Sequence, residues 1–276
     1  MATASVNGVE LYYEDMGSGE CVVLTHGSWT DATGWQEAAT LLAQRCRVVT
    51  WDRRGHSRSQ SGDGAGSRAE DAADLAALIE HVSSHPVRVV GNSYGGIITL
   101  TLVADRPDLV VSATVHEPPL FGLLEGTPDP TLQQELAAVA AEFVTVRDLI
   151  IAGRHRAAAE HFVEHVALGP GAWEQLTNEF RATLERNART FLDELADDTA
   201  LTIDTAALAS TRVPVLLTHG TRSPALFPAV IAELRRLIPA QIAVLEGAGH
   251  VPHATHTKHW ISRLVTFHEH VRPSAC

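Results

Sequence analysis

Short apolar runs recur along the chain, and most of them end at a glycine or a polar residue. Such runs are typical of strands buried on both faces of a sheet, because a strand with one face in water alternates apolar and polar residues. Segment 9–15, VELYYED, does alternate and leads into MGSGE, which predicts a first strand and a hairpin turn. The predicted buried strands are residues 21–27, 46–52, 85–93, 109–117, 213–220 and 240–247.

Segments with helical spacing of apolar residues separate most of these strands. Residues 68–84 show this most strongly, with apolar positions on one face and charged positions on the other. Because strands and helices alternate, the pattern predicts an α/β fold with a mostly parallel sheet covered by helices on both faces. Further helices are predicted at residues 31–44, 94–108, 223–239 and 258–271.

The pattern changes between residues 121 and 205, where helical spacing continues and no strand is indicated. The simplest organisation is a helical cap inserted into one α/β domain. We therefore predict a first core segment at residues 1–120, a cap at residues 121–205 and a second core segment at residues 206–276.

Composition narrows the class of protein. A chain of 276 residues with 45% hydrophobic and 20% charged residues can bury a large core. Its formal net charge of -12 argues against binding to nucleic acid or to an anionic membrane. The expected partner is a small-molecule substrate, and the chain is expected to be a monomer or a homodimer. No signal peptide and no membrane-spanning apolar run is evident, which predicts a cytoplasmic protein.

The most specific motif is GNSYG at residues 91–95, which fits the pattern G-x-S-x-G. It lies between a predicted buried strand and a predicted helix, and this strand–turn–helix context distinguishes a nucleophile elbow from a chance match. The turn holds its serine in a strained backbone conformation and exposes the hydroxyl. Ser93 is therefore the candidate nucleophile.

A serine hydroxyl needs a base to take its proton. His250, in the small-residue turn that follows the last predicted strand, is the candidate base. His253, His256 and His259 follow at three-residue steps and raise the alternative of a metal site. That spacing matches no known ligand set, and no cysteine or carboxylate accompanies it. We predict no metal and no organic cofactor.

Acyl transfer also needs hydrogen-bond donors for the oxyanion that develops in the transition state. The backbone N–H of Tyr94, directly after the nucleophile, is one candidate, and the N–H of Ser28 in the loop after residues 21–27 is the other. Trp29 in the same loop and Trp173 in the cap are candidate substrate contacts. Most other aromatic residues of the cap are expected to pack between its helices.

Five segments occur in the order found in the α/β-hydrolase family, which the chain resembles over nearly its whole length: LTHGSWTDATGW, VVTWDRRGHSRS, VVGNSYGG, LVADRPDLV and GAGHVPH. The resemblance implies an eight-stranded sheet, a serine nucleophile, a histidine base and a helical lid over the pocket. WDRRGHSRS is similar to a structural loop of that family, with His56 where glycine is frequent. Asp52 in that loop is therefore expected to be structural.

The chain departs from the family at the catalytic acid. The family most often carries this acid after the seventh strand, where this sequence has Ser223 in GTRSPALF. Glu117 follows the sixth strand, beside the nucleophile strand, and a carboxylate there can also orient the histidine. Some branches, including certain haloalkane dehalogenases and fungal zearalenone lactone hydrolases, keep their acid at this place, and VHEPP is similar to the latter. Ser223 is then expected to belong to a simple strand-to-helix connection, so Ser223→Ala should cost little activity, and His116 is expected to be a packing residue.

Together these residues predict a serine hydrolase that cleaves a small to mid-sized, mostly apolar carboxylic ester or lactone. Ser93 would attack the acyl carbon, His250 would act as general base and acid, and Glu117 would orient it. Two alternatives remain open. One is a non-hydrolytic enzyme on the same fold, such as a perhydrolase, a lyase or a biosynthetic cyclase. The other is a ligand-binding receptor with a residual triad.

Overall fold

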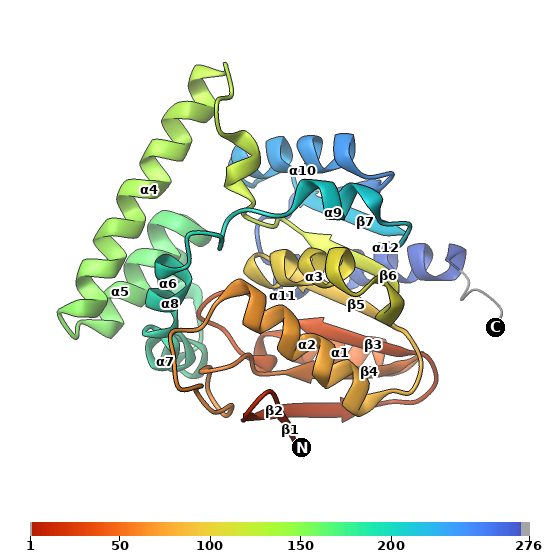
Figure 1. Ribbon diagram of the computed structural model, residues 1–276. Helices are drawn as coiled ribbons and strands as arrows, with labels where there is room; N and C mark the ends of the chain where they lie inside the picture. Colours follow the sequence, from red (N-terminus) through yellow and green to blue (C-terminus); the bar gives the residue numbers. More distant parts are fainter. Residues whose placement is uncertain (1, 272–276) are drawn as a thin grey trace.

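An eight-stranded sheet forms the centre of the molecule (Figure 1). The computed structural model describes residues 2–271. The strands lie in the order β1-β2-β4-β3-β5-β6-β7-β8, and every neighbouring pair from β4 to β8 is parallel, which confirms the predicted α/β fold. The strands are β1 (Ala2–Val6), β2 (Val9–Met16), β3 (Cys21–Thr25), β4 (Arg47–Trp51), β5 (Val87–Asn92), β6 (Val110–His116), β7 (Val215–Gly220) and β8 (Gln241–Leu245).

The prediction of a hairpin turn after residues 9–15 is wrong. β2 pairs antiparallel with β1 on one side and with β4 on the other, and it does not pair with β3. The hairpin lies instead between β1 and β2, where Asn7 and Gly8 have φ angles of 47° and 78°. Asn-Gly is the preferred sequence for a two-residue turn of this kind, because both positions need positive φ. The segment ATASV has no run of large apolar residues, so β1 owes its form to its pairing with β2.

Helices cover both faces of the sheet (Figure 1). On one face, three helices pack together: α1 (Gln36–Leu42), α11 (Pro252–Thr255) and α12 (Thr257–His270). The other face carries α2 (Arg68–Val82), α3 (Tyr94–Asp105), α9 (Thr205–Ser210) and α10 (Leu226–Leu237). Short 3-10 helices lie at Ala32–Trp35, Pro107–Leu109 and Phe121–Leu124.

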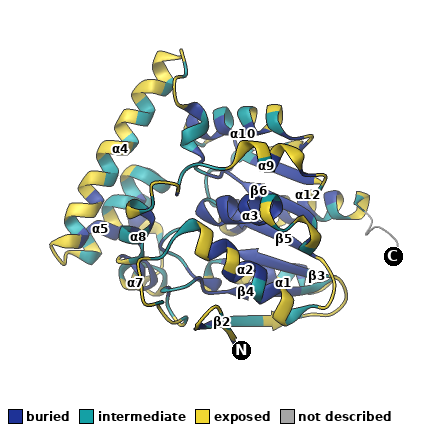
Figure 2. Cartoon of the chain, viewed as in Figure 1, coloured by how far each residue is buried: buried dark blue, intermediate teal, exposed yellow. Residues whose placement is uncertain are grey.

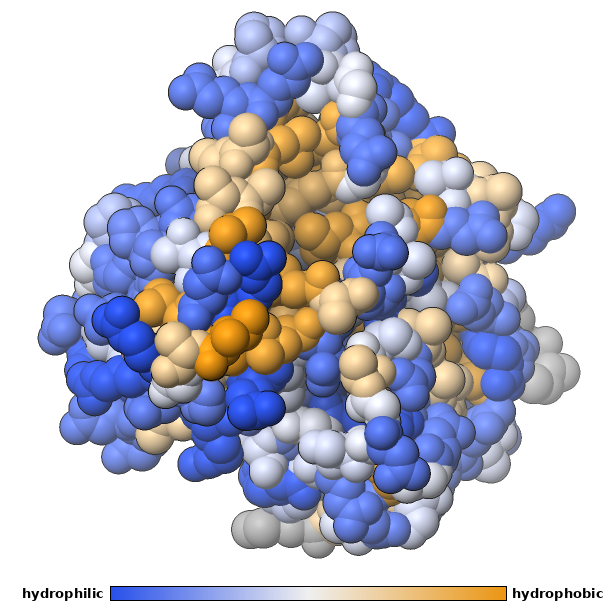
Figure 3. All heavy atoms as spheres, turned by 60° about the vertical axis from the view of Figure 1, so that its left-hand side comes forward, coloured by the Kyte–Doolittle hydropathy of each residue, from blue (hydrophilic) through white to orange (hydrophobic). Residues whose placement is uncertain are grey.

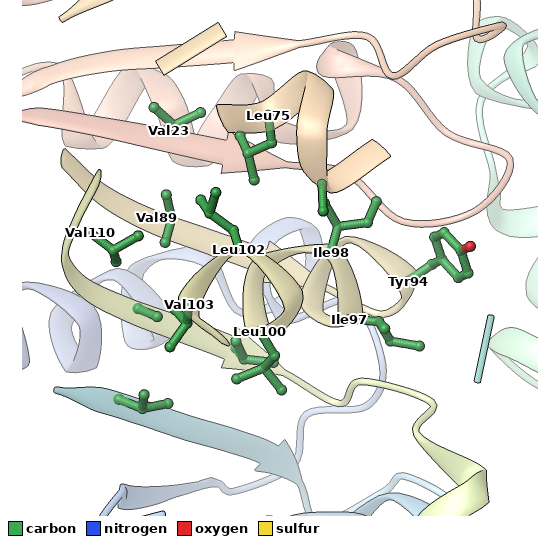
Figure 4. Close-up of a cluster of buried hydrophobic side chains, with 14 of the residues drawn as sticks. Val23, Leu75, Val89, Tyr94, Ile97, Ile98, Leu100, Leu102, Val103 and Val110 are labelled. Atoms are coloured by element: carbon green, nitrogen blue, oxygen red, sulfur yellow. The ribbon is translucent and has the colours of Figure 1, made fainter. Parts of the chain in front are cut away.

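Apolar side chains fill the space between the sheet and its helices. β5 is buried along its whole length, and α3 is buried over most of its surface, as expected for a helix that is apolar all round (Figure 2). Leu102 of α3 lies in one cluster with Leu75 of α2 and Val89 of β5 (Figure 4). The strand and the helix that flank the GNSYG turn are therefore held by close packing on both sides.

The chain between β6 and β7 is helical over the described residues, and most of it projects beyond one end of the sheet (Figure 1). A separate cluster of apolar side chains lies among these helices. The predicted cap boundaries at residues 121 and 205 remain a prediction, although α9 already packs on α3 of the core. The helices of this insertion are α4 (Pro130–Ile151), α5 (His155–Phe162), a π-helical turn (Val163–Ala167), α6 (Ala172–Gln175), α7 (Asn178–Asn187) and α8 (Thr190–Ala196).

None of the helices described between residues 2 and 271 combines the length and the apolar character that crossing a bilayer requires.

Candidate active site

The loops that follow β5, β6 and β8 meet at one edge of the sheet, under the helical insertion. Ser93 and His250 both line a cavity there. The rest of its wall is mostly apolar, and Figure 3 shows apolar side chains gathered around a hollow on this side of the molecule. The cavity residues are Ser28, Ser93, Tyr94, Pro119, Phe121, Val139, Phe143, Phe162, Val166, Ala167, Phe191, Glu194, Leu195, Ala200, Leu201, Pro224, Leu226, Phe227 and His250.

Ser93 occupies a strained turn between β5 and α3. Its φ of 55° and ψ of -127° lie outside the regions that residues other than glycine normally adopt. Close approach of the backbone forces the flanking residues to be glycine: a Cβ added at Gly91 would lie 2.2 Å from the carbonyl oxygen of Gly95, and one at Gly95 would lie 2.3 Å from that of Thr25. The turn therefore has the geometry of a nucleophile elbow.

Glu117 and His250 are joined by a hydrogen bond. His250 Nδ1 lies 2.8 Å from Glu117 Oε2, and the glutamate side chain is completely buried. The backbone of Glu117 has a positive φ of 46°, just where two prolines end β6. Since an ionised carboxylate only accepts, the proton of this bond lies on Nδ1, which leaves Nε2 to act as the base.

The second carboxylate oxygen of Glu117 is bound by the loop after β7. Oε1 accepts a hydrogen bond from the backbone N–H of Gly220 at 2.8 Å and another from the hydroxyl of Ser223. The loop was expected to serve mainly as a strand-to-helix connection, and the contact of Ser223 with Glu117 gives it a second role. The loop lacks a carboxylate, but its Ser223 and the last residue of β7, Gly220, each donate to the carboxylate that follows β6.

His116 does more than pack in the core. Its Nε2 lies 3.2 Å from the carbonyl oxygen of Gly249, and its Nδ1 lies 2.9 Å from the hydroxyl oxygen of Thr218. A carbonyl only accepts, so Nε2 carries the proton and Nδ1 accepts from Thr218. Burial lowers the pKa of His116 to about 4, which keeps the ring neutral. The ring thus fixes the residue directly before His250.

Two further contacts hold His250. The side-chain amide of Asn92 donates to the backbone carbonyl of His250 at 2.9 Å. The ring of Phe227 stacks on the imidazole with 4.6 Å between ring centres.

The structure records no hydrogen bond between the Ser93 hydroxyl and the His250 ring within residues 2–271. Such bonds are frequently long in enzymes without substrate and tighten when it binds.

Ser28 and Tyr94, the predicted oxyanion-hole residues, both line the cavity beside Ser93. Tyr94 begins α3, so its backbone N–H has no acceptor within the helix. The Ser28 loop packs directly against the nucleophile, because a Cβ added at Gly27 would lie 3.0 Å from the Cβ of Ser93. That the two N–H groups stabilise an oxyanion remains a prediction.

Trp29 and Trp173, the predicted substrate contacts, do not line the cavity. Their exposed fractions are 1% and 2%, and both belong to the apolar cluster of the helical insertion. Trp29 stacks on Phe162 with 5.0 Å between ring centres and lies 5.4 Å from Phe191. This choice of substrate residues is therefore corrected: Trp29 anchors the insertion to the core, while Phe162 and Phe191 reach the cavity. The sequence pattern does not specify which aromatic side chains of the insertion face the cavity, because this depends on how its helices pack.

Asp52 and His56 hold the loop after β4. Asp52 is fully buried and accepts hydrogen bonds from the backbone N–H of Ala32 and from the guanidinium of Arg58. His56 Nε2 lies 2.9 Å from the hydroxyl of Thr190 in the helical insertion. Neither residue lines the cavity, so the structure places both in the scaffold, as was expected for Asp52.

The four regularly spaced histidines do not converge. His250 faces the cavity, while His253 is buried against Trp35 with 4.2 Å between ring centres. Among residues 2–271, no group of three or more histidine, cysteine or acidic side chains is arranged to hold a metal ion.

A serine on an elbow, a histidine held by a buried carboxylate and an adjacent apolar cavity define the class of an α/β hydrolase. Residues 22–263 match the model of the alpha/beta hydrolase family, and the chain belongs to that family.

Two curated relatives match part of the chain. An uncharacterised hydrolase, YraK of Bacillus subtilis, is 39% identical over 126 residues, covering 45% of this chain and 46% of the relative. A non-heme haloperoxidase of Rhodococcus erythropolis is 35% identical over 131 residues, covering 46% and 47%. The chain thus matches about half the length of these curated relatives.

Solved structures match over nearly the whole chain. A carboxylesterase of Nitrososphaera gargenis has a TM-score of 0.79 at 24% identity and covers 98% of each chain. The enol-lactonase of Burkholderia xenovorans LB400 has a TM-score of 0.75 at 20% identity and covers 96% of this chain and 99% of its own. At these identities the likeness shows a shared fold.

The close packing of the nucleophile elbow predicts that one methyl group added at Gly95 lowers the stability of the protein. In Gly95→Ala the new Cβ would collide with the carbonyl oxygens of Thr25 and His26, at 2.3 and 2.5 Å. We expect the free energy of unfolding to fall by roughly 1–3 kcal/mol in urea denaturation. Gly64→Ala is the matched control, since its Cβ would meet no atom within 4 Å. Equal stability of the two variants would contradict the geometry of the turn.

The contact with Glu117 reverses the expectation that Ser223→Ala costs little: the variant should reduce turnover, because it removes one of the donors that hold Glu117. A hydrogen bond to a charged group contributes about 1.5–3 kcal/mol, and the partly exposed position of Ser223 reduces that figure, so we expect kcat to fall roughly three- to tenfold with KM nearly unchanged. Steady-state kinetics over a range of pH provides the measurement, with exposed Ser210→Ala as the control. If kcat stays at the wild-type level, the contact has no functional role.

Glu117 should make stability depend on pH. Burial by itself raises the pKa of Glu117, but the hydrogen bonds from His250 and from the N–H of Gly220 outweigh burial and lower it to about 2. A lowered folded-state pKa means that the ionised group stabilises the fold above pH 4.5 and that this contribution is lost as the pH falls from 4.5 toward 2.

The free energy of unfolding of wild type and of Glu117→Gln, measured in urea from pH 7 to pH 3, tests this dependence. The stability difference between the two should narrow as the pH falls. Glu125→Gln, at an exposed position, controls for the loss of a surface carboxylate. A stability difference that stays constant from pH 7 to pH 3 would contradict this prediction.

Proposed function

We propose that this α/β hydrolase cleaves small to mid-sized, mostly uncharged carboxylic esters or lactones through an acyl-enzyme on Ser93. The observation that carries the proposal is the hydrogen bond between buried Glu117 and His250, in a cavity that also presents Ser93. Glu117 holds Nδ1 protonated and stabilises the imidazolium, which is the part an acid has in a catalytic triad.

The chemistry runs in two halves. His250 Nε2 takes the proton of Ser93 as its oxygen attacks the acyl carbon, and the oxyanion is bound by the N–H groups of Ser28 and Tyr94. The imidazolium then protonates the leaving alkoxide, and the acyl-enzyme remains. In the second half, His250 takes a proton from a water whose oxygen attacks the same carbon. The bond between that carbon and the oxygen of Ser93 then breaks, the imidazolium returns the proton to Ser93, and the acid is released.

The cavity supports an uncharged substrate. Its wall is built mostly from apolar side chains, among them Phe143, Phe162 and Leu226, which favour burial of an acyl chain or a ring. The fold is shared with a carboxylesterase and with an enol-lactonase. Hydrolysis of an ester and hydrolysis of a lactone are both transfers of an acyl group to water. Lactones are included in the proposal because the segment around Glu117, the acid after β6, is similar to that of fungal lactone hydrolases.

A perhydrolase is the second candidate, because one partial relative is a non-heme haloperoxidase. Hydrogen peroxide would then replace water in the second half of the reaction. Hydrolysis in ¹⁸O-labelled water distinguishes the two, since a hydrolase incorporates one solvent oxygen into the acid that it releases.

Ser93→Ala provides the direct test. Wild type should hydrolyse p-nitrophenyl esters and react with a fluorophosphonate probe, which attaches to an activated serine. Ser93→Ala should lose both properties, with residual hydrolysis at least about 10³-fold slower. The control Ser210→Ala should keep both. Labelling or hydrolysis that persists in Ser93→Ala would exclude Ser93 as the nucleophile.

A further inference from the structure

One part of the cavity wall is polar, and the proposed reaction does not use all of it. Glu194 of α8 lines the cavity at 8% exposure, on the same wall as Ser28 and Tyr94. It is a second carboxylate beside the nucleophile, and it comes from the helical insertion, whereas Glu117 comes from the sheet.

Glu194 is tied to the core by two hydrogen bonds. Oε1 accepts from Nη1 of Arg53 at 2.9 Å, and Oε2 accepts from the hydroxyl of Ser28 at 2.5 Å. Arg53 also binds Asp71 at 2.6 Å and is 2% exposed. One guanidinium thus serves two carboxylates, so the group carries a net charge of about −1 when all three are ionised.

This ion-pair network explains how α8 is fixed to the core, but it leaves acceptor capacity unused. Each carboxylate oxygen has two lone pairs, and the structure records one partner for each oxygen of Glu194 within the described chain. Burial raises the pKa of Glu194, and Arg53 opposes that effect. A group that donates a hydrogen bond would stabilise the carboxylate further.

Tyr94 adds an independent observation. Tyr94 lines the cavity and is 2% exposed, and its buried hydroxyl has no hydrogen-bond partner within residues 2–271. The guanidinium of Arg53 lies over the ring, 4.5 Å from its centre, which places the ring beside the Glu194 network. Figure 4 shows the hydroxyl directed away from the apolar cluster around α3. A buried hydroxyl without a partner costs roughly 1–3 kcal/mol, so phenylalanine would be the better residue if this position served packing alone.

We propose that Glu194, Ser28 and Tyr94 form a polar subsite that binds a hydroxyl group on the acyl part of the substrate. A hydroxyl is both donor and acceptor, so it can donate to Glu194 and accept from the hydroxyl of Tyr94. Ser28 and Tyr94 also provide the proposed oxyanion donors, so the bound hydroxyl lies within a few bonds of the reacting carbonyl. The preferred substrates are neutral 2- or 3-hydroxy esters or the corresponding lactones, and the negative charge of the network disfavours anions.

The subsite rests on the proposed function, and a pair of substrates tests it. Ethyl hexanoate and ethyl 3-hydroxyhexanoate differ by one hydroxyl, and ethyl 2-hydroxyhexanoate tests the neighbouring position. Wild type should show a kcat/KM at least about tenfold higher for one of the hydroxy esters, since a site built around a hydroxyl discriminates against the ester that lacks it. Tyr94→Phe and Glu194→Gln should each lower this ratio of kcat/KM values toward one.

Tyr13→Phe is the matched control, because it removes the hydroxyl of a half-buried tyrosine on β2 that does not line the cavity. It should leave the ratio unchanged. Calorimetric titration of the same esters into Ser93→Ala gives their relative Kd without turnover, and the hydroxy ester should bind more tightly by a similar factor.

The outcomes separate the two proposals. A wild-type ratio near one for both hydroxy esters, or a ratio that neither Tyr94→Phe nor Glu194→Gln changes, overturns the subsite while hydrolysis itself stands. Absence of both hydrolysis and fluorophosphonate labelling overturns the proposed function, and in that case the Kd ratio with Ser93→Ala still decides whether a hydroxyl is recognised.

Discussion

The site depends on one buried carboxylate, that of Glu117, and on the groups that donate hydrogen bonds to it. A charge removed from water is costly unless hydrogen bonds replace its hydration. Here one oxygen binds the ring of His250, and the other binds the N–H of Gly220 and the hydroxyl of Ser223. The carboxylate therefore joins the loops after β6, β7 and β8, and it fixes the base relative to the elbow after β5. The loop after β7, where the family resemblance implies an acid, here supports an acid that comes from the neighbouring strand.

Much of this arrangement can be predicted from sequence because it depends on local rules. Apolar runs that end in glycine predict the parallel strands, and strand–GNSYG–helix predicts the elbow, since only glycine fits beside the turn. The choice of Glu117 rests on the resemblance to the α/β-hydrolase family, which implies an acid after the seventh or the sixth strand, and the loop after β7 has no acid. The strands and the elbow need only the period of each element and the spacing of the glycines, whereas Glu117 also needs the family resemblance.

Other features depend on contacts between distant segments, and no local pattern specifies them. β1 forms because β2 offers a partner. The contact of Ser223 with Glu117 joins residues 106 positions apart, and the contact of Ser28 with Glu194 joins residues 166 apart. The directions of Trp29 and Trp173 are set by packing within the helical insertion. Glu194 in particular reads as an ordinary polar position of a helix until the fold brings it against Arg53.

The measurement that tests the central claim most directly is the second-order rate constant for phosphonylation of Ser93 in Glu117→Gln and in wild type. Glutamine has nearly the shape of glutamate but cannot stabilise an imidazolium or impose the required tautomer. If Glu117 orients His250, the rate constant should fall by about 10³–10⁴. A rate constant within tenfold of wild type would show that the histidine does not depend on this carboxylate and would contradict the account.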